Sequence, residues 1–533
     1  MIVDAPTQSG TWSRVPDGAS VNDENEPLAA GESHPWRVAA IFVLPYLLLG
    51  IAWLGSNPAG AAPDEDAHVV KALGIAGLDI GAPYVGPIGL PGSLEERIAS
   101  SSRVVTIPSK LSPAGLTCFR FEPLVTAACQ PESPPRDQGN ISVPTSVGSY
   151  PLFLYLPIGL AAQTADTPLM AFAAARGVIL LETTLLLWLA SAHLVRWLGR
   201  RALVGVAVAL TPVAVFCMAI VNTSGLEVFG GLGVASVVVV AHRYPESLKA
   251  RRTQLTLLIS GTTLILSRPL GVLTMGALVM LLLADGGWRP VWEQFRRPRR
   301  LFLATVVALG ASTLAVSLWE WKFDHPVNVG PWASGGSAAL FGRFFPFLTS
   351  SGVGIFGWFD TQMPTWALLL WQVLLMLLMG IAFLEGRRRD RWVLVVATTV
   401  TIMVAYILFA AVFYPIRTGV QGRHMLPLFV IVPVFAGVVI TERLGRKGLV
   451  RVFSVVAVLV PVLQFLGLYI NARRYAVGAA YQPLNFLGHA RWEPALGWYA
   501  WLGIGCVGSV MMIVILIAFA GTSEQDSRAS VAQ

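Results

Sequence analysis

Long apolar segments recur along the whole of this chain, and they restrict it to one class of fold. A helix needs about 20 mostly apolar residues to cross the hydrocarbon core of a bilayer, and its backbone polar groups must be bonded within the segment. Hydrophobic residues make up 55% of the sequence and charged residues only 13%. We therefore expect an all-α polytopic membrane protein with about 12 transmembrane helices. The segments are 36–55, 169–195, 202–221, 224–242, 254–267, 269–285, 301–319, 364–384, 392–413, 425–441, 450–469 and 498–520.

Clusters of Lys and Arg separate these segments and indicate their direction, because loops rich in these residues stay in the cytoplasm. The clusters lie at 196–201, 242–252, 289–300, 385–389 and 443–451. Only an even number of crossings keeps both 242–252 and 289–300 inside. The region between them is therefore expected to divide into two short helices at Arg268-Pro269. The net charge of +8 falls in these loops, so we expect no nucleic-acid partner.

The polar stretches divide the chain into two tails and one membrane domain. The predicted units are a disordered cytoplasmic tail (1–35), a multi-pass domain (36–520) with large exterior loops at 57–148 and 320–363, and a cytoplasmic C-terminal tail (521–533). The apolar stretch 150–162 is too short to cross and is expected to be a juxtamembrane or re-entrant helix. The first apolar run also fits a signal peptide, but its full spanning length favours a retained helix.

The four cysteines fall into two kinds of surroundings. Cys118 and Cys129 lie in the first exterior loop, where a disulfide is expected in an oxidising compartment. Cys217 and Cys506 lie in apolar segments and are expected to pack as small hydrophobic residues. The seven His show no zinc-type spacing, so no metal site is predicted.

An acidic segment, Pro63-Asp64-Glu65-Asp66-Ala67-His68, directly follows the first apolar run. If Pro63 takes the first position of a helix, most of the residues Asp64, Glu65, His68 and Lys71 lie on the same helix face. This arrangement would bring a proton acceptor and cations together at the membrane surface. Acidic residues in a first turn are also common because they complement the helix dipole. Both interpretations stay open at this stage.

Further polar groups stand at or near membrane depth, where they are costly and frequently functional. The short exterior connection 414–424 contains Gln421, Arg423 and His424, besides Arg417. A guanidinium there suits a phosphate, although snorkelling to lipid head groups is the alternative.

Trp358 and Asp360 could line a sugar site or belong to an interfacial aromatic belt. The remaining candidates are Arg268 at the helix break, Arg176 and Glu182 on different faces of one segment, and Asn222 and Glu227 at a turn that is as well explained by solvation.

These carboxylates, arginines and aromatic residues gather on the predicted exterior side. The sequence contains no Gly-x-x-x-x-Gly-Lys-Ser/Thr motif for ATP,. An enzyme that uses a lipid-borne, phosphate-containing substrate fits this distribution better than a pump.

The order of these motifs resembles the DUF2142 family of bacterial membrane proteins, which is similar to the GT-C superfamily of membrane glycosyltransferases. The matching residues are Pro63-Asp64-Glu65 with His68, Tyr150-Pro151-Leu152 with Tyr155, Gly357-Trp358-Phe359-Asp360 with Pro364, and Gln421-Gly422-Arg423-His424 with Pro427. The resemblance implies a GT-C-like bundle in the bacterial plasma membrane, with an active site that faces the exterior or periplasm.

The resemblance also implies a reaction, which is transfer of a sugar from a polyprenyl-phosphate donor to a glycan or glycolipid acceptor of the cell envelope, with inversion. The general base would be Asp64 or Glu65. Adjacency to His68 favours Glu65, whereas a position straight after the first span favours Asp64. Arg423 and Arg268 would stabilise the leaving phosphate. The other implied substrate contacts are His68, Lys71, Tyr150, Trp358, Asp360, Gln421 and His424, and a divalent cation is an open possibility.

Two other functions use the same kinds of residues. A transporter or flippase of lipid-linked sugars would use the arginines and carboxylates as a substrate clamp, although such proteins usually carry paired repeats with matching helix breaks. A polymerase or ligase of surface polysaccharide would transfer a whole glycan from the same type of lipid phosphate. Either one would belong, like the glycosyltransferase, to cell-wall biogenesis.

Overall fold

The computed structural model describes residues 34–80, 102–131, 139–284, 288–296, 299–323, 336–415, 419–480 and 484–521. The predicted disordered tails therefore lie almost wholly outside the described residues, as does Arg417.

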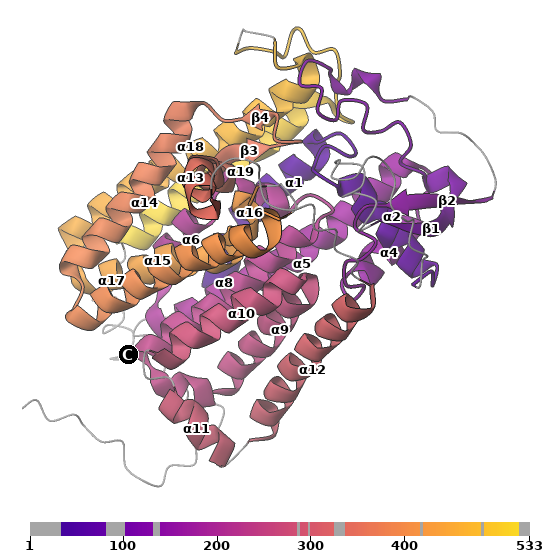
Figure 1. Ribbon diagram of the computed structural model, residues 1–533. Coiled ribbons are helices and arrows are strands. Elements are labelled where there is room, and N and C mark those ends of the chain that lie inside the picture. Colours follow the sequence, from indigo (N-terminus) through magenta and orange to yellow (C-terminus); the bar gives the residue numbers. More distant parts are fainter. Residues whose placement is uncertain are drawn as a thin grey trace, which may run out of the picture.

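Helices dominate the described part of the chain (Figure 1). Within it, nine helical segments are long and apolar enough to cross a membrane, so the chain is a multi-pass membrane protein. These segments are α1 (Pro35–Ser56), α5 (Pro168–Leu198), α8 (Thr223–Arg243), α12 (Arg300–Phe323), α14 (Thr365–Glu385), α15 (Arg388–Leu408) with the π-turn Phe409–Phe413, α16 (Gly422–Phe429) continued by α17 (Ile431–Arg443), α18 (Arg446–Val477) and α19 (Gly497–Gly521).

The other expected segments are built from shorter helices. The segment 202–221 contains α6 (Leu203–Ala209) and α7 (Pro212–Cys217), separated where Thr211 caps α7 by accepting a hydrogen bond from the Ala214 N–H. The region 254–285 contains α9 (Arg251–Ser267) and α10 (Pro269–Leu282). Arg268 between them is extended, with φ −160° and ψ 162°. The break predicted at Arg268-Pro269 is confirmed, because a proline cannot donate the hydrogen bond that would continue α9.

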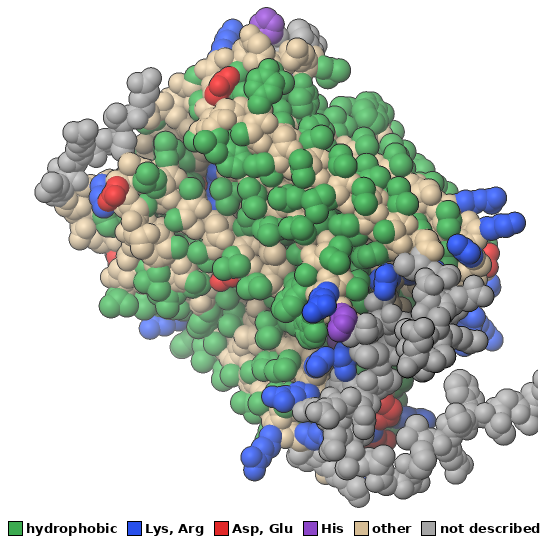
Figure 2. Space-filling view, turned by 180° about the vertical axis from the view of Figure 1, so that it is seen from behind, with side chains coloured by type: hydrophobic (Ala, Val, Ile, Leu, Met, Phe, Trp, Pro, Cys, Tyr) green, Lys and Arg blue, Asp and Glu red, His purple; other side chains and the backbone are tan. Residues whose placement is uncertain are grey.

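One end of the bundle is basic. There Arg243 of α8 pairs with Asp390 of α15 (Nη1–Oδ1, 2.6 Å) and with Glu442 of α17 (Nε–Oε2, 2.9 Å). The Arg252 guanidinium lies over the ring of Trp36, which places the start of α1 at the same end. We call this the basic end. Figure 2 shows a broad hydrophobic surface along the bundle, with Lys and Arg side chains gathered mainly towards one end. This is the charge distribution that the positive-inside rule describes.

The opposite end, which we call the site end, carries a small layer built from the expected first exterior loop (Figure 1). Helix α2 (Glu65–Ala76) packs on α4 (Tyr155–Gln163) and beside the antiparallel strands β1 (Arg103–Pro108) and β2 (Asn140–Thr145). A Cβ on Gly159 would stand 1.9 Å from the Ala72 carbonyl oxygen, so glycine permits this close contact between α2 and α4,. Short helices η1 (Ser109–Leu111) and η2 (Ala127–Cys129) complete the layer. The short helix expected within 150–162 is α4.

The second expected exterior loop is largely helical. Helix α12 extends to Phe323, and α13 (Ser337–Gly354) is followed by the two-residue strands β3 (Ile355–Phe356) and β4 (Thr361–Gln362). The connection expected at 320–363 thus contains the end of α12 and the whole of α13. The aromatic sequence around Phe341, Phe344 and Phe345 packs on neighbouring helices, for example Phe341 on Phe409 at a 5.7 Å centroid distance. Long-range packing of this kind stabilises a helix that the local sequence does not predict.

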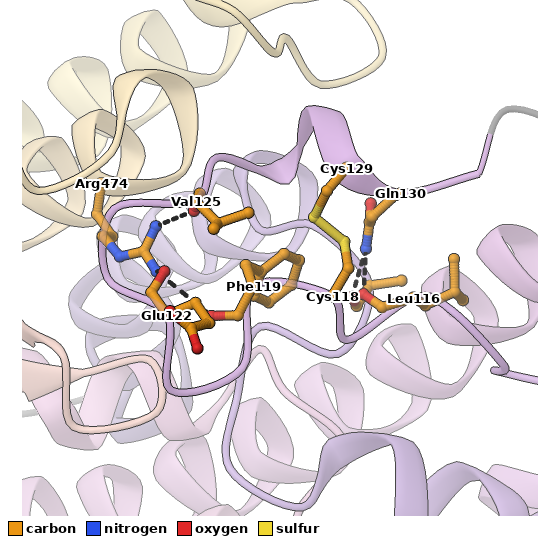
Figure 3. Close-up of a disulfide and its surroundings, with 9 residues drawn as sticks. Leu116, Cys118, Phe119, Glu122, Val125, Cys129, Gln130 and Arg474 are labelled. Carbon is orange, nitrogen blue, oxygen red and sulfur yellow. Dashed lines mark hydrogen bonds between the residues drawn. A yellow bond between two sulfur atoms is a disulfide. The ribbon is translucent and has the colours of Figure 1, made fainter.

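A disulfide joins Cys118 and Cys129 at the site end, with the two Cα atoms 6.0 Å apart. Figure 3 shows how the loop it closes is attached to α18. Arg474 donates to the backbone oxygens of Val125 (2.6 Å) and Glu122 (3.0 Å). Gln130 donates to the Leu116 oxygen at 2.7 Å. The loop is thus fixed both by a covalent bond and by a buried guanidinium.

Candidate functional site

Glu65 is enclosed in an ion pair with Arg176 of α5. The Arg176 Nε and Nη2 atoms lie 2.7 Å from the two Glu65 carboxylate oxygens, and the Val221 N–H donates to Oε1 at 3.0 Å. The Arg176 side chain is 4% exposed and the Glu65 side chain is 0% exposed. Arg176 also donates to the backbone oxygens of Asn57 and Pro58 at 2.8 Å. Because both carboxylate oxygens are engaged, this pair holds the start of α2 against α5.

Asp64, the preceding residue, has different surroundings. The helix begins at Glu65 and not at Pro63, and Asp64 occupies its N-cap position in the left-handed region, with φ 61°. Glu65, His68 and Lys71 follow one another at three-residue intervals within α2, whereas Asp64 lies outside the helix. The Asp64 side chain is 40% exposed, and one carboxylate oxygen lies 3.9 Å from Nη2 of Arg423. A non-glycine residue at positive φ is costly and frequently marks a functional position.

Arg268 is held at the break between α9 and α10 by the first turn of α8. Its Nε donates to the Thr223 hydroxyl at 2.7 Å, and its Nη2 donates to the Asn222 Oδ1 at 2.5 Å. Its Nη1 lies 3.6 Å from Oε2 of Glu227, which is completely buried. The guanidinium also lies over the ring of Tyr150, 5.4 Å from the centroid. Arg268 is thus fixed in orientation, while its contact with the buried carboxylate stays longer than a hydrogen bond.

Arg423 lies in the first turn of α16 and is buried over the ring of Phe359. A close backbone contact places this turn, because a Cβ on Gly422 would stand 2.0 Å from the Gly352 nitrogen. Among the described residues, the Arg423 Nε has no hydrogen-bond partner. With the described residues, Arg423 forms one ion pair, the 3.9 Å contact with Asp64. Arg423 therefore keeps unused donor capacity.

A small pocket adjoins these groups. Its lining includes Pro63, Cys217, Phe359, Gln421 and Arg423. The Oε1 of Gln421 and the Nδ1 of His424 have no hydrogen-bond partner among the described residues, and the His424 ring stacks on Phe413. Of these two residues, Gln421 lines the pocket, so its unpartnered oxygen is available to a ligand there,. We call Asp64, Asn222, Thr223, Glu227, Arg268 and Arg423 together the arginine cluster.

His68 of α2 completes one side of the site. Its Nδ1 lies 2.6 Å from the Tyr155 hydroxyl. Burial lowers the pKa of His68 well below its usual value, and the positive charges of Arg268, Arg423 and Lys71 lower this pKa further. Burial raises the pKa of Tyr155, because in both residues it disfavours the charged form. At neutral pH the pair is therefore an uncharged hydrogen bond beside the guanidinium groups.

Other predicted site residues are engaged by protein groups. Lys71 donates to the backbone oxygens of Gly148 and Tyr150. The Trp358 indole donates to the Gly60 oxygen at 3.0 Å. Asp360 accepts from Arg474 at 2.7 and 3.0 Å. In the structure these three side chains attach the loops of the site end to one another.

The structure therefore brings together Asp64, His68, Tyr150, Arg268 and Arg423, and it separates them from Glu65. The interpretation of Asn222 and Glu227 as a solvated turn is wrong, because they are 1% and 0% exposed. The sequence identifies Arg176 as a charge at membrane depth and Glu65 as a candidate base, but it does not predict that the two residues pair. An ionisable residue in an apolar segment was the signal for both Arg176 and Glu227. In the described part of the chain, no three His, Cys, Asp or Glu residues are grouped so that they could hold a metal ion.

Comparison with known proteins gives one family match. The family model described as "Predicted membrane protein (DUF2142)" matches residues 47–432. We find no curated protein that matches the sequence. Among solved structures, ArnT from Cupriavidus metallidurans in the apo state is similar with a TM-score of 0.42 and 15% identity, over 90% of this chain and 76% of that one. The same protein bound to undecaprenyl phosphate gives 0.43 and 15%, over 92% and 78%. A likeness this distant assigns no function and no residue roles here.

Proposed function

This chain belongs to the DUF2142 family of predicted membrane proteins, and from that premise we propose that it is a membrane glycosyltransferase. It would transfer a sugar from a polyprenyl-phosphate donor to a cell-envelope acceptor at the exterior face of the plasma membrane. The observation that carries the proposal is that two buried guanidinium groups meet carboxylates only at long distance, Arg268 at 3.6 Å from Glu227 and Arg423 at 3.9 Å from the partly exposed Asp64. All four residues lie within the matched range.

The buried arginines support a phosphate ligand. Removing a guanidinium from water is costly unless its charge and donors are matched. Arg268 meets Glu227 only at 3.6 Å, and Arg423 meets Asp64 only at 3.9 Å, with its Nε unpartnered within the described chain. A phosphate would supply short, charge-assisted hydrogen bonds to both groups.

The position of Arg268 supports a lipid-borne phosphate. Helix α10 has 14 residues between the site end and the basic end, which corresponds to about 21 Å. This length is less than the hydrocarbon core of about 30 Å. If the basic end of α10 lies at one membrane surface, Arg268 at its N-cap lies within the bilayer, where a phosphate attached to a lipid tail could reach it.

Asp64 is the carboxylate that we assign as the general base. Both oxygens of Glu65 are occupied by Arg176 and a backbone N–H, whereas the Asp64 carboxylate is partly exposed beside Arg423. In the proposed step Asp64 accepts the proton of the acceptor hydroxyl, whose oxygen forms a bond to the anomeric carbon. The bond from that carbon to the phosphate oxygen breaks, and the polyprenyl phosphate leaves with its negative charge stabilised by Arg268 and Arg423. Direct displacement inverts the anomeric carbon.

The experiment is a release assay on the full chain in nanodiscs. The protein is incubated with a panel of polyprenyl-phosphate sugars, with and without extracted envelope glycans and glycolipids, and free polyprenyl phosphate is followed by mass spectrometry. We expect release that depends on both donor and acceptor, with an inverted product. Addition of EDTA reports whether a divalent cation takes part.

The alternative functions give different results in the same system. A flippase would bind the donors without releasing polyprenyl phosphate, and in proteoliposomes it would move them between leaflets. A polymerase or ligase would release the lipid phosphate only with donors that carry a whole glycan. Binding without release across the panel would overturn the glycosyltransferase proposal.

A further inference from the structure

Helix α11 (Trp288–Arg296) lies at the basic end, beyond the ends of α9, α10 and α12 (Figure 1). Trp288, Trp292 and Phe295 are spaced at i, i+4 and i+7, so they share one helix face. Their exposed fractions are 53%, 53% and 51%. A nine-residue helix thus presents Trp288 and Trp292 outward, while the half-exposed Phe295 also contacts Phe302 of α12 at a centroid distance of 5.0 Å.

The opposite face of α11 is fixed to the bundle. Gln294 is buried, accepts a hydrogen bond from Gln254 of α9 at 2.7 Å and donates to the Leu248 oxygen at 3.2 Å. Glu293 pairs with Lys249 at 2.9 Å. These contacts determine the orientation of the helix, so the outward direction of its aromatic face is a property of the fold.

Arginines flank the aromatic face. The Arg289 guanidinium lies 5.5 Å from the Trp288 ring, and the Arg296 guanidinium lies 5.7 Å from a Trp292 ring. Both arginines are exposed, as are Arg299 and Arg300 just beyond the helix. Across these described residues, Glu293 is the one acidic side chain beside four arginines.

We propose that α11 lies in the head-group layer of the cytoplasmic leaflet and that Arg289 and Arg296 bind the phosphates of anionic phospholipids. Indole rings prefer the membrane interface, where their apolar body and polar N–H are both accommodated. A short helix with aromatic residues on one face and arginines beside them is typical of segments that lie in the membrane plane. The positive charge complements the anionic inner leaflet. This lipid site is at the end opposite the arginine cluster and is independent of the proposed transfer.

The test compares the full chain in nanodiscs of phosphatidylcholine with nanodiscs that also contain phosphatidylglycerol. We expect amide hydrogen exchange over 288–300 to be slower when the anionic lipid is present. In detergent, phosphatidylglycerol should bind more tightly than phosphatidylcholine. The variant Arg289→Gln/Arg296→Gln should lose roughly fivefold in this affinity for each charge removed.

A matched control variant removes the same number of positive charges at the site end. Arg343→Gln/Arg491→Gln removes two exposed arginines away from α11 and should leave both measurements unchanged. Trp288→Ala/Trp292→Ala should speed exchange over 288–300 in both lipids. Equal exchange in the two lipids, or equal losses in the two arginine variants, would overturn the proposal. Protection that rises with protein concentration without lipid would also overturn it, because a second copy would then cover the helix.

Discussion

The network around Asp390 at the basic end and the arginine cluster at the site end use buried arginine and carboxylate groups in opposite ways. At the basic end, Asp390 accepts from Arg243 at 2.6 Å, from the Arg387 N–H at 3.0 Å and pairs with His242 at 3.2 Å. At the site end, Arg268 and Arg423 meet their carboxylates only at 3.6 and 3.9 Å. Closed networks of the first kind hold helices together. Long, incomplete contacts of the second kind leave charge available for a ligand, which is why we place function at the site end.

The largest effect should follow from removing the proposed base. Asp64→Asn keeps the size of the side chain but cannot accept the proton, so acceptor-dependent release of polyprenyl phosphate should fall by roughly 10²–10⁴-fold. The measurement is the initial rate of release at saturating donor. Asp166→Asn is the matched control, because Asp166 is an 88% exposed carboxylate. Normal release by Asp64→Asn would remove Asp64 from the chemistry.

Glu65→Gln should act on stability, because it leaves the Arg176 charge buried without its partner. We expect a loss of about 3–5 kcal/mol in the free energy of unfolding. The measurement is denaturant or thermal unfolding in detergent, with the exposed Glu122→Gln as control. In a double-mutant cycle with Arg176→Gln, the combined loss should be smaller than the sum of the single losses. A Glu65→Gln protein as stable as wild type would contradict the assignment of Glu65 to structure.

Asp390→Asn should have a smaller effect at the basic end. Arg243 keeps its contact with Glu442 at 2.9 Å, so we expect a loss of about 1–3 kcal/mol in unfolding free energy. The rate of transfer per folded molecule should not change. A large loss of turnover with normal stability would show that the two ends do not divide their roles as described.

The smallest effect concerns Lys71, which lies at the site end and, among the described residues, donates to the backbone oxygens of Gly148 and Tyr150. Burial and the nearby charge of Arg103 lower the pKa of Lys71 from 10.5 to about 7, with Glu320 acting in the opposite direction. Between pH 7 and pH 10.5, Lys71 is protonated in the unfolded chain but largely neutral in the folded one. The unfolded chain therefore binds more protons, and the free energy of unfolding rises with pH through this range. The unfolding temperature of Lys71→Met should therefore rise less between pH 7 and pH 10 than that of wild type. Parallel curves would contradict this assignment.

The sequence predicts the features that depend on local chemistry. The helix break at Arg268-Pro269 follows from the missing proline N–H, and the basic end follows from the distribution of Lys and Arg. The separation of Asp64 from Glu65 could not be predicted. It depends on a left-handed backbone at Asp64 and on Arg176, which lies 111 positions from Glu65. The burial of Asn222 and Glu227 depends in the same way on helices that are distant in sequence.

The most direct measurement is the binding of polyprenyl phosphate to the purified protein in detergent. It would compare wild type with Arg423→Gln, Arg268→Gln and the exposed control Arg343→Gln. We predict that each substitution in the arginine cluster weakens binding at least about tenfold, the loss of one charge-assisted contact, and that Arg343→Gln binds like wild type. Equal affinity in all four proteins would contradict the claim that the buried arginines are held for a lipid phosphate.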